Sequence, residues 1–125
     1  MASAVAAFFK KSLPTGRIAV AIDRHGEVAD SPEVDQLARE FRAVKVKRSA
    51  VVACDAATPH RCQLRGVSVL VAIHIRVMTA SAAEAALAWE TAGAHGQLSF
   101  SAFRVALERR EGRWIVVRVL GQEAT

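Results

Sequence analysis

The sequence has little of several features that define common protein classes. Its 125 residues include no tyrosine, three prolines, two cysteines and only 6% aromatic residues. With 52% hydrophobic residues and so few prolines, the chain is neither disordered nor collagen-like. No apolar run reaches the 18 or so residues of a membrane-spanning helix, so we expect no membrane span. A chain of this length buries enough surface to fold as one domain without a lattice of disulfides or metals.

The short motifs of several enzyme classes are also missing. The sequence has no phosphate-binding Walker loop, dinucleotide-binding glycine fingerprint, serine elbow or HExxH zinc motif. Its serines in the predicted strands have no His–Asp arrangement near them in the sequence, so a hydrolase triad has no support. We therefore expect no cofactor, and no motif assigns a reaction.

The charge balance is basic. There are 17 Lys and Arg residues against 12 Asp and Glu residues, a net charge of +5. Such an excess favours anionic partners, and the densest cluster of cations extends from Arg39 to Arg48. Nucleic-acid binding through Arg39–Arg48 is therefore one hypothesis. Apolar residues and Glu40 interrupt the cluster, so a solvated basic surface is the simpler interpretation and nucleic acid ranks last among the partners considered.

The first residues do not match an export signal. MASAVAAFF is apolar, but Lys10 and Lys11 come after it, whereas a secretory signal has its positive region first. We expect a cytoplasmic protein by default. Export is the alternative if Cys54 and Cys62 form a disulfide.

Hydrophobic periodicity predicts two helices and then a run of strands. The helices are expected over 2–12 and 32–43, the second with Ser31 as its N-cap and Pro32 in its first turn. Strands are expected over 17–23, 44–54, 65–78, 82–92, 98–110 and 113–120. Segment 82–92 is ambiguous, because its alanines favour a helix while its alternation favours a strand. We interpret it as a strand because it lies between two strong strands.

The connections between the later strands are short. Glu111 and Gly112 form the best hairpin signal of the chain, and no helix fits between the strands that precede them. Parallel neighbours would need such helices, so the strands are expected to run antiparallel. The sequence predicts a single α+β domain over residues 1–125, with the N-terminal helices packed on one face of an antiparallel sheet.

Two segments resemble a known superfamily. FRVALERREGRWIVVRVLG is similar to the last hairpin of the nuclear transport factor 2-like superfamily, which belongs to the cystatin-like group. CDAATPHRCQLRGVSVLVAI resembles a subset of uncharacterised, often exported bacterial members with two cysteines before the central strand. The resemblance covers about Val34 to Leu120. It implies a cone-like, strongly curved sheet around the helices and a cavity that some members use for catalysis and others for binding or dimer formation.

The catalytic pattern of the superfamily is absent. Its enzymatic members, such as ketosteroid isomerases and polyketide cyclases, place an Asp or an Asp/His pair in the cavity, usually with a tyrosine. This chain has no tyrosine and no Asp after Asp55. The resemblance therefore implies a fold and assigns no catalytic residue.

Cys54 and Cys62 bracket seven residues that include a proline. Cysteines at the two ends of a hairpin loop can reach each other, and closing such a loop would stabilise the fold by about 2–3 kcal/mol in an oxidising compartment. Two alternatives stay open, which are two free thiols and, with His60, part of a metal site. The metal alternative is the weakest, since structural zinc needs four ligands in tighter pairs.

His74 is the residue most suited to acid–base chemistry. It lies in a predicted strand on the same face as Arg76, and neighbouring strands can bring Trp89 and Arg104 close to it, which defines a candidate pocket. A general base needs a nearby carboxylate, for which Glu84 and Glu90 are the candidates. A surface histidine is the simpler interpretation of His74, and core packing is the simpler one of Trp89 and Trp114.

Three functions from different classes follow. The first is a non-catalytic ligand-binding or protein-interaction domain that self-associates, with a homodimer and a small apolar ligand as expected partners. The second is a small cavity enzyme of the isomerase, cyclase or dehydratase type that uses His74. The third is nucleic-acid binding. The first agrees best with a cavity-forming fold that lacks an acid–base set.

Overall fold

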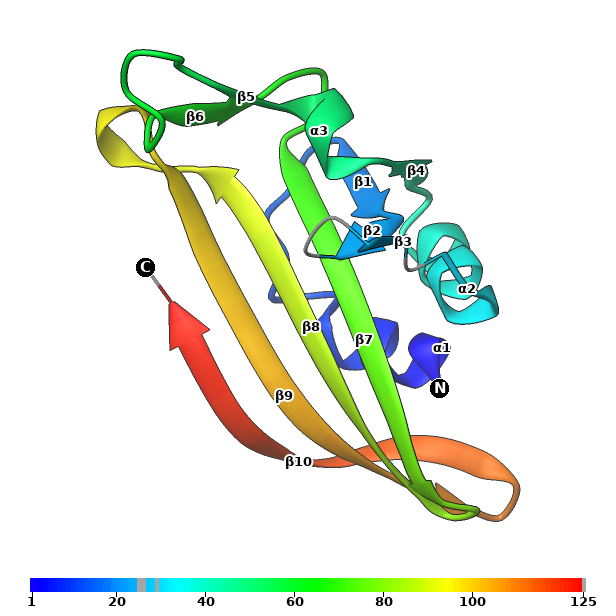
Figure 1. The fold of residues 1–125 in the computed structure, drawn as a ribbon. Coiled ribbons are helices and arrows are strands. Elements are labelled where there is room, and N and C mark those ends of the chain that lie inside the picture. The colour runs from blue at the N-terminus through cyan, green and yellow to red at the C-terminus, as the bar shows by residue number, and fades with distance from the viewer. Residues whose placement is uncertain (25–26, 29, 125) are drawn as a thin grey trace.

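A computed structural model describes residues 1–24, 27–28 and 30–124 (Figure 1). Its helices are α1 (Ala2–Phe9), α2 (Pro32–Glu40), α3 (Arg48–Val51) and the 3₁₀ turn η1 (Ala94–Gly96). Its short strands are β1 (Ile18–Ala21), β2 (Asp23–Arg24), β3 (Glu27–Val28), β4 (Val44–Val46), β5 (Val52–Cys54) and β6 (Cys62–Leu64). Its long strands are β7 (Val69–Thr79), β8 (Ala82–Ala92), β9 (Leu98–Arg110) and β10 (Arg113–Ala124). The α+β class is confirmed.

Within the described residues, the main sheet has six strands in the order β10-β9-β8-β7-β1-β4. Strands β7 to β10 form an antiparallel meander of consecutive neighbours. The ambiguous segment 82–92 is strand β8, and every second residue from Ala83 to Trp89 is buried. Burial on one face of a strand therefore outweighs the helical preference of its alanines. The hairpin at Glu111 and Gly112 is confirmed, and both residues have the positive φ of a two-residue hairpin turn.

The prediction of one strand over 44–54 is wrong. This segment divides into β4, α3 and β5, and β5 pairs with β6 in a separate two-stranded sheet. The chain turns at Arg48, whose backbone N–H donates to the Asp23 carboxylate while Val51 becomes buried. Strand β4 lies parallel to β1, and β1 lies parallel to β7, so the sheet is not antiparallel throughout. Helix α2 supplies the crossover that the parallel pair β1–β4 requires.

Several predicted boundaries also move. The first helix ends at Phe9 instead of residue 12, and the second ends at Glu40 instead of 43, because Arg42 adopts a positive φ. Ser31 is confirmed as the N-cap, since its side chain accepts a hydrogen bond from the Val34 N–H. The predicted strand 17–23 divides at Ile22 into β1 and β2, strand 65–78 begins only at Val69, and the last strand extends from 113 to Ala124.

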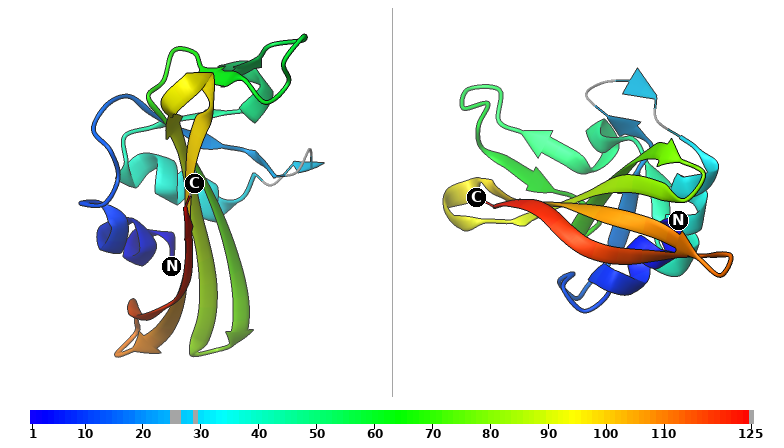
Figure 2. Two further views of the ribbon diagram at one scale, coloured as in Figure 1. Left: turned by 90° about the vertical axis from the view of Figure 1, so that its left-hand side faces the viewer. Right: turned by 90° about the horizontal axis from the view of Figure 1, so that it is seen from below.

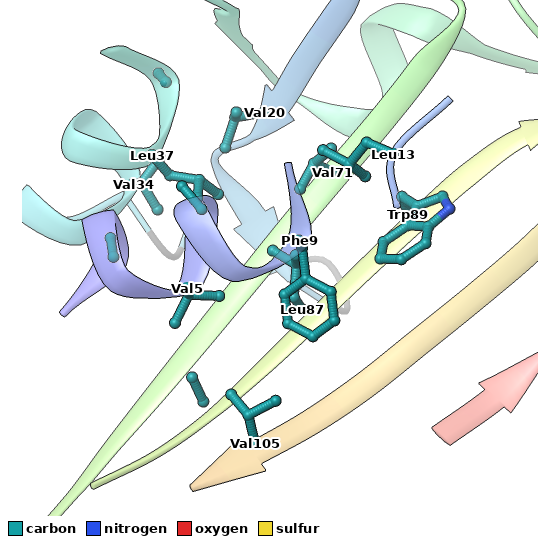
Figure 3. Packing of buried hydrophobic residues seen from close by; sticks show 14 of the residues in the cluster. Val5, Phe9, Leu13, Val20, Val34, Leu37, Val71, Leu87, Trp89 and Val105 are labelled. Carbon is teal, nitrogen blue, oxygen red and sulfur yellow. The ribbon is translucent and has the colours of Figure 1, made fainter. Parts of the chain in front are cut away.

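The main core lies between the helices and one face of the sheet. Figure 2 shows α1 and α2 on one side of the sheet, with β2–β3 and β5–β6 on the other. Figure 3 shows Phe9 of α1 beside Leu87 and Trp89 of β8. The Trp89 and Phe103 rings are stacked with centroids 5.3 Å apart, and Phe9 also contacts both rings. Large side chains therefore fill the space between the helices and the sheet.

The opposite face carries a second, smaller core. Ala19, Ala21 and Leu70 pack there against Val51 of α3. This cluster covers the face over β4, β1 and the first residues of β7, at the end where α3 and the β5–β6 hairpin cross the sheet (Figure 1). Further along β7, β8 and β9, the same face has small side chains and forms the candidate site.

Candidate functional site

Side chains of β7, β8 and β9 form regular rows on the face opposite the helices. Because successive residues of a strand point to opposite faces, the even-numbered residues of these strands share this face. The strand register aligns them as Leu70–Glu90–Phe100, then Ala72–Ala88–Ala102, then His74–Ala86–Arg104. The middle row consists of three alanines.

The alanines leave a hollow in this face. A cavity of about 300 Å³ lies over Ala72, Ala86, Ala88 and Ala102, and we call it the alanine pocket. Leu70 and Phe100 add apolar surface at one end, and Ala21 of β1 lines a side. The volume is at the small end of the range for ligand sites, and the lining is mainly apolar, as is usual for such sites. The pocket therefore suits a small apolar molecule.

One end of the alanine pocket is charged. The Arg48 guanidinium donates from Nε to Glu90 Oε1 at 3.0 Å and from Nη2 to Glu90 Oε2 at 2.8 Å. The Arg48 backbone N–H donates to Asp23 Oδ1 at 2.9 Å, so Asp23 lies at the same end. Hydrogen bonding to the Glu90 carboxylate raises the pKa of Arg48 above its ordinary value. This bidentate pair joins α3 to β8, and its Glu90 side chain is only 19% exposed.

His74 lies at the other end of the pocket and is exposed. Glu90 pairs with Leu70, four residues from His74 along β7, so Glu90 and His74 are offset by about 13 Å along the strand direction at roughly 3.3 Å per residue. Glu84 is opposite Arg76 and therefore diagonal to His74 on the same face. Of the two predicted carboxylates, Glu84 is nearer to His74, while Glu90 is bonded to Arg48.

The candidate pocket predicted from the sequence is assembled only in part. His74, Arg76 and Arg104 share one face, and His74 lines the alanine pocket. Trp89 is also among the residues around the alanine pocket, but its side chain lies on the other face, 7% exposed and stacked on Phe103. It acts as a core anchor, because an odd position of β8 faces the helices. Trp114 also packs against this core and is partly buried.

Cys54 and Cys62 form a disulfide. They are directly opposite each other in the β5–β6 hairpin, with their Cα atoms 4.0 Å apart. Both thiols are used in this bond, so free thiols and a cysteine metal site do not describe the structure. Over residues 1–24, 27–28 and 30–124, no group of three or more His, Cys, Asp or Glu side chains is placed to hold a metal ion.

The basic stretch Arg39–Arg48 does not form one continuous cationic surface. Lys45 pairs with Asp35 and Asp30, whose carboxylates raise the pKa of Lys45, and Arg48 pairs with Glu90. Arg39, Arg42 and Lys47 are exposed. Two of the five cations are therefore already matched by carboxylates of this chain.

Sequence reasoning missed the alanine row and the partners of Arg48. The pattern of 82–92 predicts a strand, but it does not show which alanines of other strands lie beside Ala86 and Ala88. Ala72, Ala88 and Ala102 become neighbours only through the register of three strands, which the order of residues does not show. Arg48 was counted only as part of a basic cluster, although it joins α3 to β8.

Comparison with protein-family models, curated proteins and solved structures found no significant match to this chain. In the part of the chain that the structure describes, no helix combines the length and the apolar character needed to cross a membrane.

Proposed function

We propose that this chain is a non-catalytic binding domain that holds a small apolar ligand in the alanine pocket. The observation that carries the proposal is the row of Ala72, Ala88 and Ala102, which leaves a hollow of about 300 Å³ in a sheet face. At one end of this face, α3 and the β5–β6 hairpin pack against the sheet. A ligand in the hollow would bury the apolar surface that the alanines and Phe100 expose, which favours binding.

For the fold, we propose a divergent member of the nuclear transport factor 2-like superfamily. The order of helix, short strand, helix and four-stranded meander supports this proposal, as do the β-bulges that bend β10 after Val116 and Val119. Two features depart from the expected cone. The space between helices and sheet is filled by Phe9, Trp89 and Phe103, and the alanine pocket is on the other face.

The proposed function is tested with N-phenyl-1-naphthylamine, an apolar dye that is uncharged at neutral pH and brightens in apolar sites. At about 0.3 kcal/mol for each of its 17 non-hydrogen atoms, the expected Kd is on the order of 100 µM. Ala102→Leu places a larger side chain in the hollow and should weaken binding about tenfold, since overlap with a bound molecule costs about 1–3 kcal/mol.

Ala106→Leu is the matched control. Ala106 is on the same strand and the same face as Ala102, but it belongs to the row of Arg76 and Glu84 and does not line the pocket. Its dye affinity should equal that of the unmodified chain. Equal loss in both variants, or no dye binding at millimolar concentration, contradicts the proposed function.

Self-association is a second candidate function, and the edge strand β10 favours it. This 12-residue strand ends the sheet and leaves Ile115 36% and Val119 45% exposed, whereas the other edge, β4, has only three residues. A long edge strand can pair with a second copy of the same chain. Light scattering between 1 and 100 µM tests this, and a monomer over the whole range contradicts it.

The other two hypotheses stay predictions. Catalysis by His74 needs a carboxylate within about 4 Å, and the register places Glu84 nearer to it than Glu90. Nucleic-acid binding through Arg39–Arg48 predicts an affinity that falls steeply with salt. A gel-shift experiment at low salt measures that dependence, and the absence of any shift contradicts the hypothesis.

A further inference from the structure

The charged end of the alanine pocket has an excess of negative charge. Two carboxylates, Asp23 and Glu90, meet there with one guanidinium, that of Arg48. The end therefore carries one uncompensated negative charge among its lining residues. This is notable in a chain whose net charge is +5, because the surrounding surface would otherwise favour anions.

The two carboxylates are used differently. Glu90 is matched by Arg48 through two charge-assisted hydrogen bonds, so its charge is largely compensated within the pair. Asp23 accepts its hydrogen bond from the Arg48 backbone N–H, a neutral donor that does not cancel the carboxylate charge. Asp23 also interacts electrostatically with the Arg48 guanidinium, but that guanidinium is hydrogen-bonded to Glu90, so two carboxylates share one cation and Asp23 is the one without a charge-assisted hydrogen bond to it.

We infer that the alanine pocket binds a small apolar amine, with its hydrocarbon part on the alanine floor and its ammonium group against Asp23. This inference rests on the proposed function and adds the chemical class of the ligand. An ammonium group would supply the positive charge that balances the charged end of the pocket, and its N–H groups donate hydrogen bonds to carboxylate oxygens. The cavity of about 300 Å³ limits the hydrocarbon part to a few rings or a short chain.

An apolar carboxylate fits the same end less well. Arg48 is the cation within the lining that would receive it, and two of its N–H donors already bond to Glu90. The incoming anion would also lie close to both Asp23 and Glu90, and like charges at short range repel. A neutral molecule of the same shape makes the same apolar contacts, and it is neither attracted nor repelled by the carboxylates.

Three compounds with one skeleton separate these cases: 3-phenylpropylamine, 3-phenylpropan-1-ol and 3-phenylpropanoate. Each is titrated against the dye-loaded chain, with the disulfide intact, and its Kd is obtained from displacement. The amine should bind about fivefold tighter than the alcohol, because one partly exposed ion pair contributes a factor of this size. The carboxylate should bind most weakly. Raising the salt concentration from 50 to 500 mM should reduce the amine preference, since the charges are partly screened.

Asp23→Asn is the decisive variant. Asparagine keeps an oxygen that accepts the Arg48 N–H and loses only the charge. The amine should then bind no tighter than the alcohol, while the alcohol affinity stays unchanged. Asp55→Asn is the matched control, because Asp55 Oδ1 also accepts a backbone N–H, that of Ala57, and Asp55 does not line the pocket. The control should keep the full amine preference.

The outcomes separate this inference from the proposed function. Equal binding of amine and alcohol to the unmodified chain, or tightest binding of the carboxylate, overturns the amine inference and leaves the pocket as an apolar site. Loss of all binding, or displacement that Ala102→Leu does not affect, overturns the proposed function itself. If Asp23→Asn does not fold, Glu90→Gln tests the same charge, since it also makes the end neutral and should abolish the amine preference.

Discussion

Strand β8 presents two different surfaces to the two faces of the sheet. On the helix face, Leu87 and Trp89 are buried against large side chains such as Phe103. On the opposite face, Ala86 and Ala88 form the floor of the alanine pocket, and Glu90 lies at one end of it. The two sets alternate along a single strand, so backbone geometry is the same for both. Side-chain size alone makes one face a packed core and leaves the other with a site.

Because of this difference, we expect the helix face to determine the stability of the domain and the alanine face to determine ligand binding. Protein cores are close-packed, so a change of even one methylene on the helix face should change the free energy of unfolding. The alanine face is less constrained. Ala72 packs partly against the second core, whereas Ala88 and Ala102 lie outside that cluster and line the hollow. Substitutions on the two faces should therefore affect different measurements.

The largest effect is expected on the helix face. Leu87 is fully buried, and Leu87→Ala should lower the free energy of unfolding by about 3 kcal/mol, through lost apolar contact and the cavity that remains. Urea denaturation measures this value. A loss below about 1 kcal/mol would show that the helix face is not a close-packed core, and the contrast between the two faces would disappear.

The contrast between the faces was only half predictable from the sequence. Alternation over 82–92 predicts which residues of β8 share a face, and Ser31 with Pro32 predicts the start of α2, because both signals are local. The positions of β1 and β4 were not predicted. A parallel neighbour depends on a crossover and on contacts distant in sequence, so β4 leaves the run of antiparallel strands that the pattern of 44–54 suggested.

The site itself was less predictable than the fold. His74 and Glu90 were identified as polar residues of a strand, and both line the pocket. The hollow between them depends on the register that aligns Ala72, Ala88 and Ala102, and alanine carries no chemical signal of its own. Asp23 and Arg48 are 25 residues apart in the sequence, and only the fold brings them into contact.

An intermediate effect is expected where the open face is joined to α3. Arg48→Ala removes two charge-assisted hydrogen bonds and leaves the Glu90 carboxylate, 19% exposed, without this partner. We expect a loss of about 1 kcal/mol in the free energy of unfolding, because the pair is only partly shielded from water.

Arg110→Ala is the matched control for this pair. Arg110 also makes two bonds to a glutamate, Glu108, but its side chain is 60% exposed and that of Glu108 is 44% exposed. The expected loss is below about 0.5 kcal/mol. Equal losses in the two variants would mean that the charged end of the pocket is no better shielded than an exposed hairpin.

The smallest effect on stability is expected at the floor of the pocket. Ala88→Leu adds three carbons on the open face, where the hollow can accept them, so the free energy of unfolding should change by less than about 0.5 kcal/mol. Ala85→Leu adds the same atoms to the same strand on the helix face, where Ala85 is 1% exposed, and overpacking should cost about 1–3 kcal/mol. Dye binding should show the reverse order, with loss in Ala88→Leu and retention in folded Ala85→Leu. A destabilisation of Ala88→Leu equal to that of Ala85→Leu would mean that the alanine row is already packed, since a filled surface cannot accept a leucine without strain.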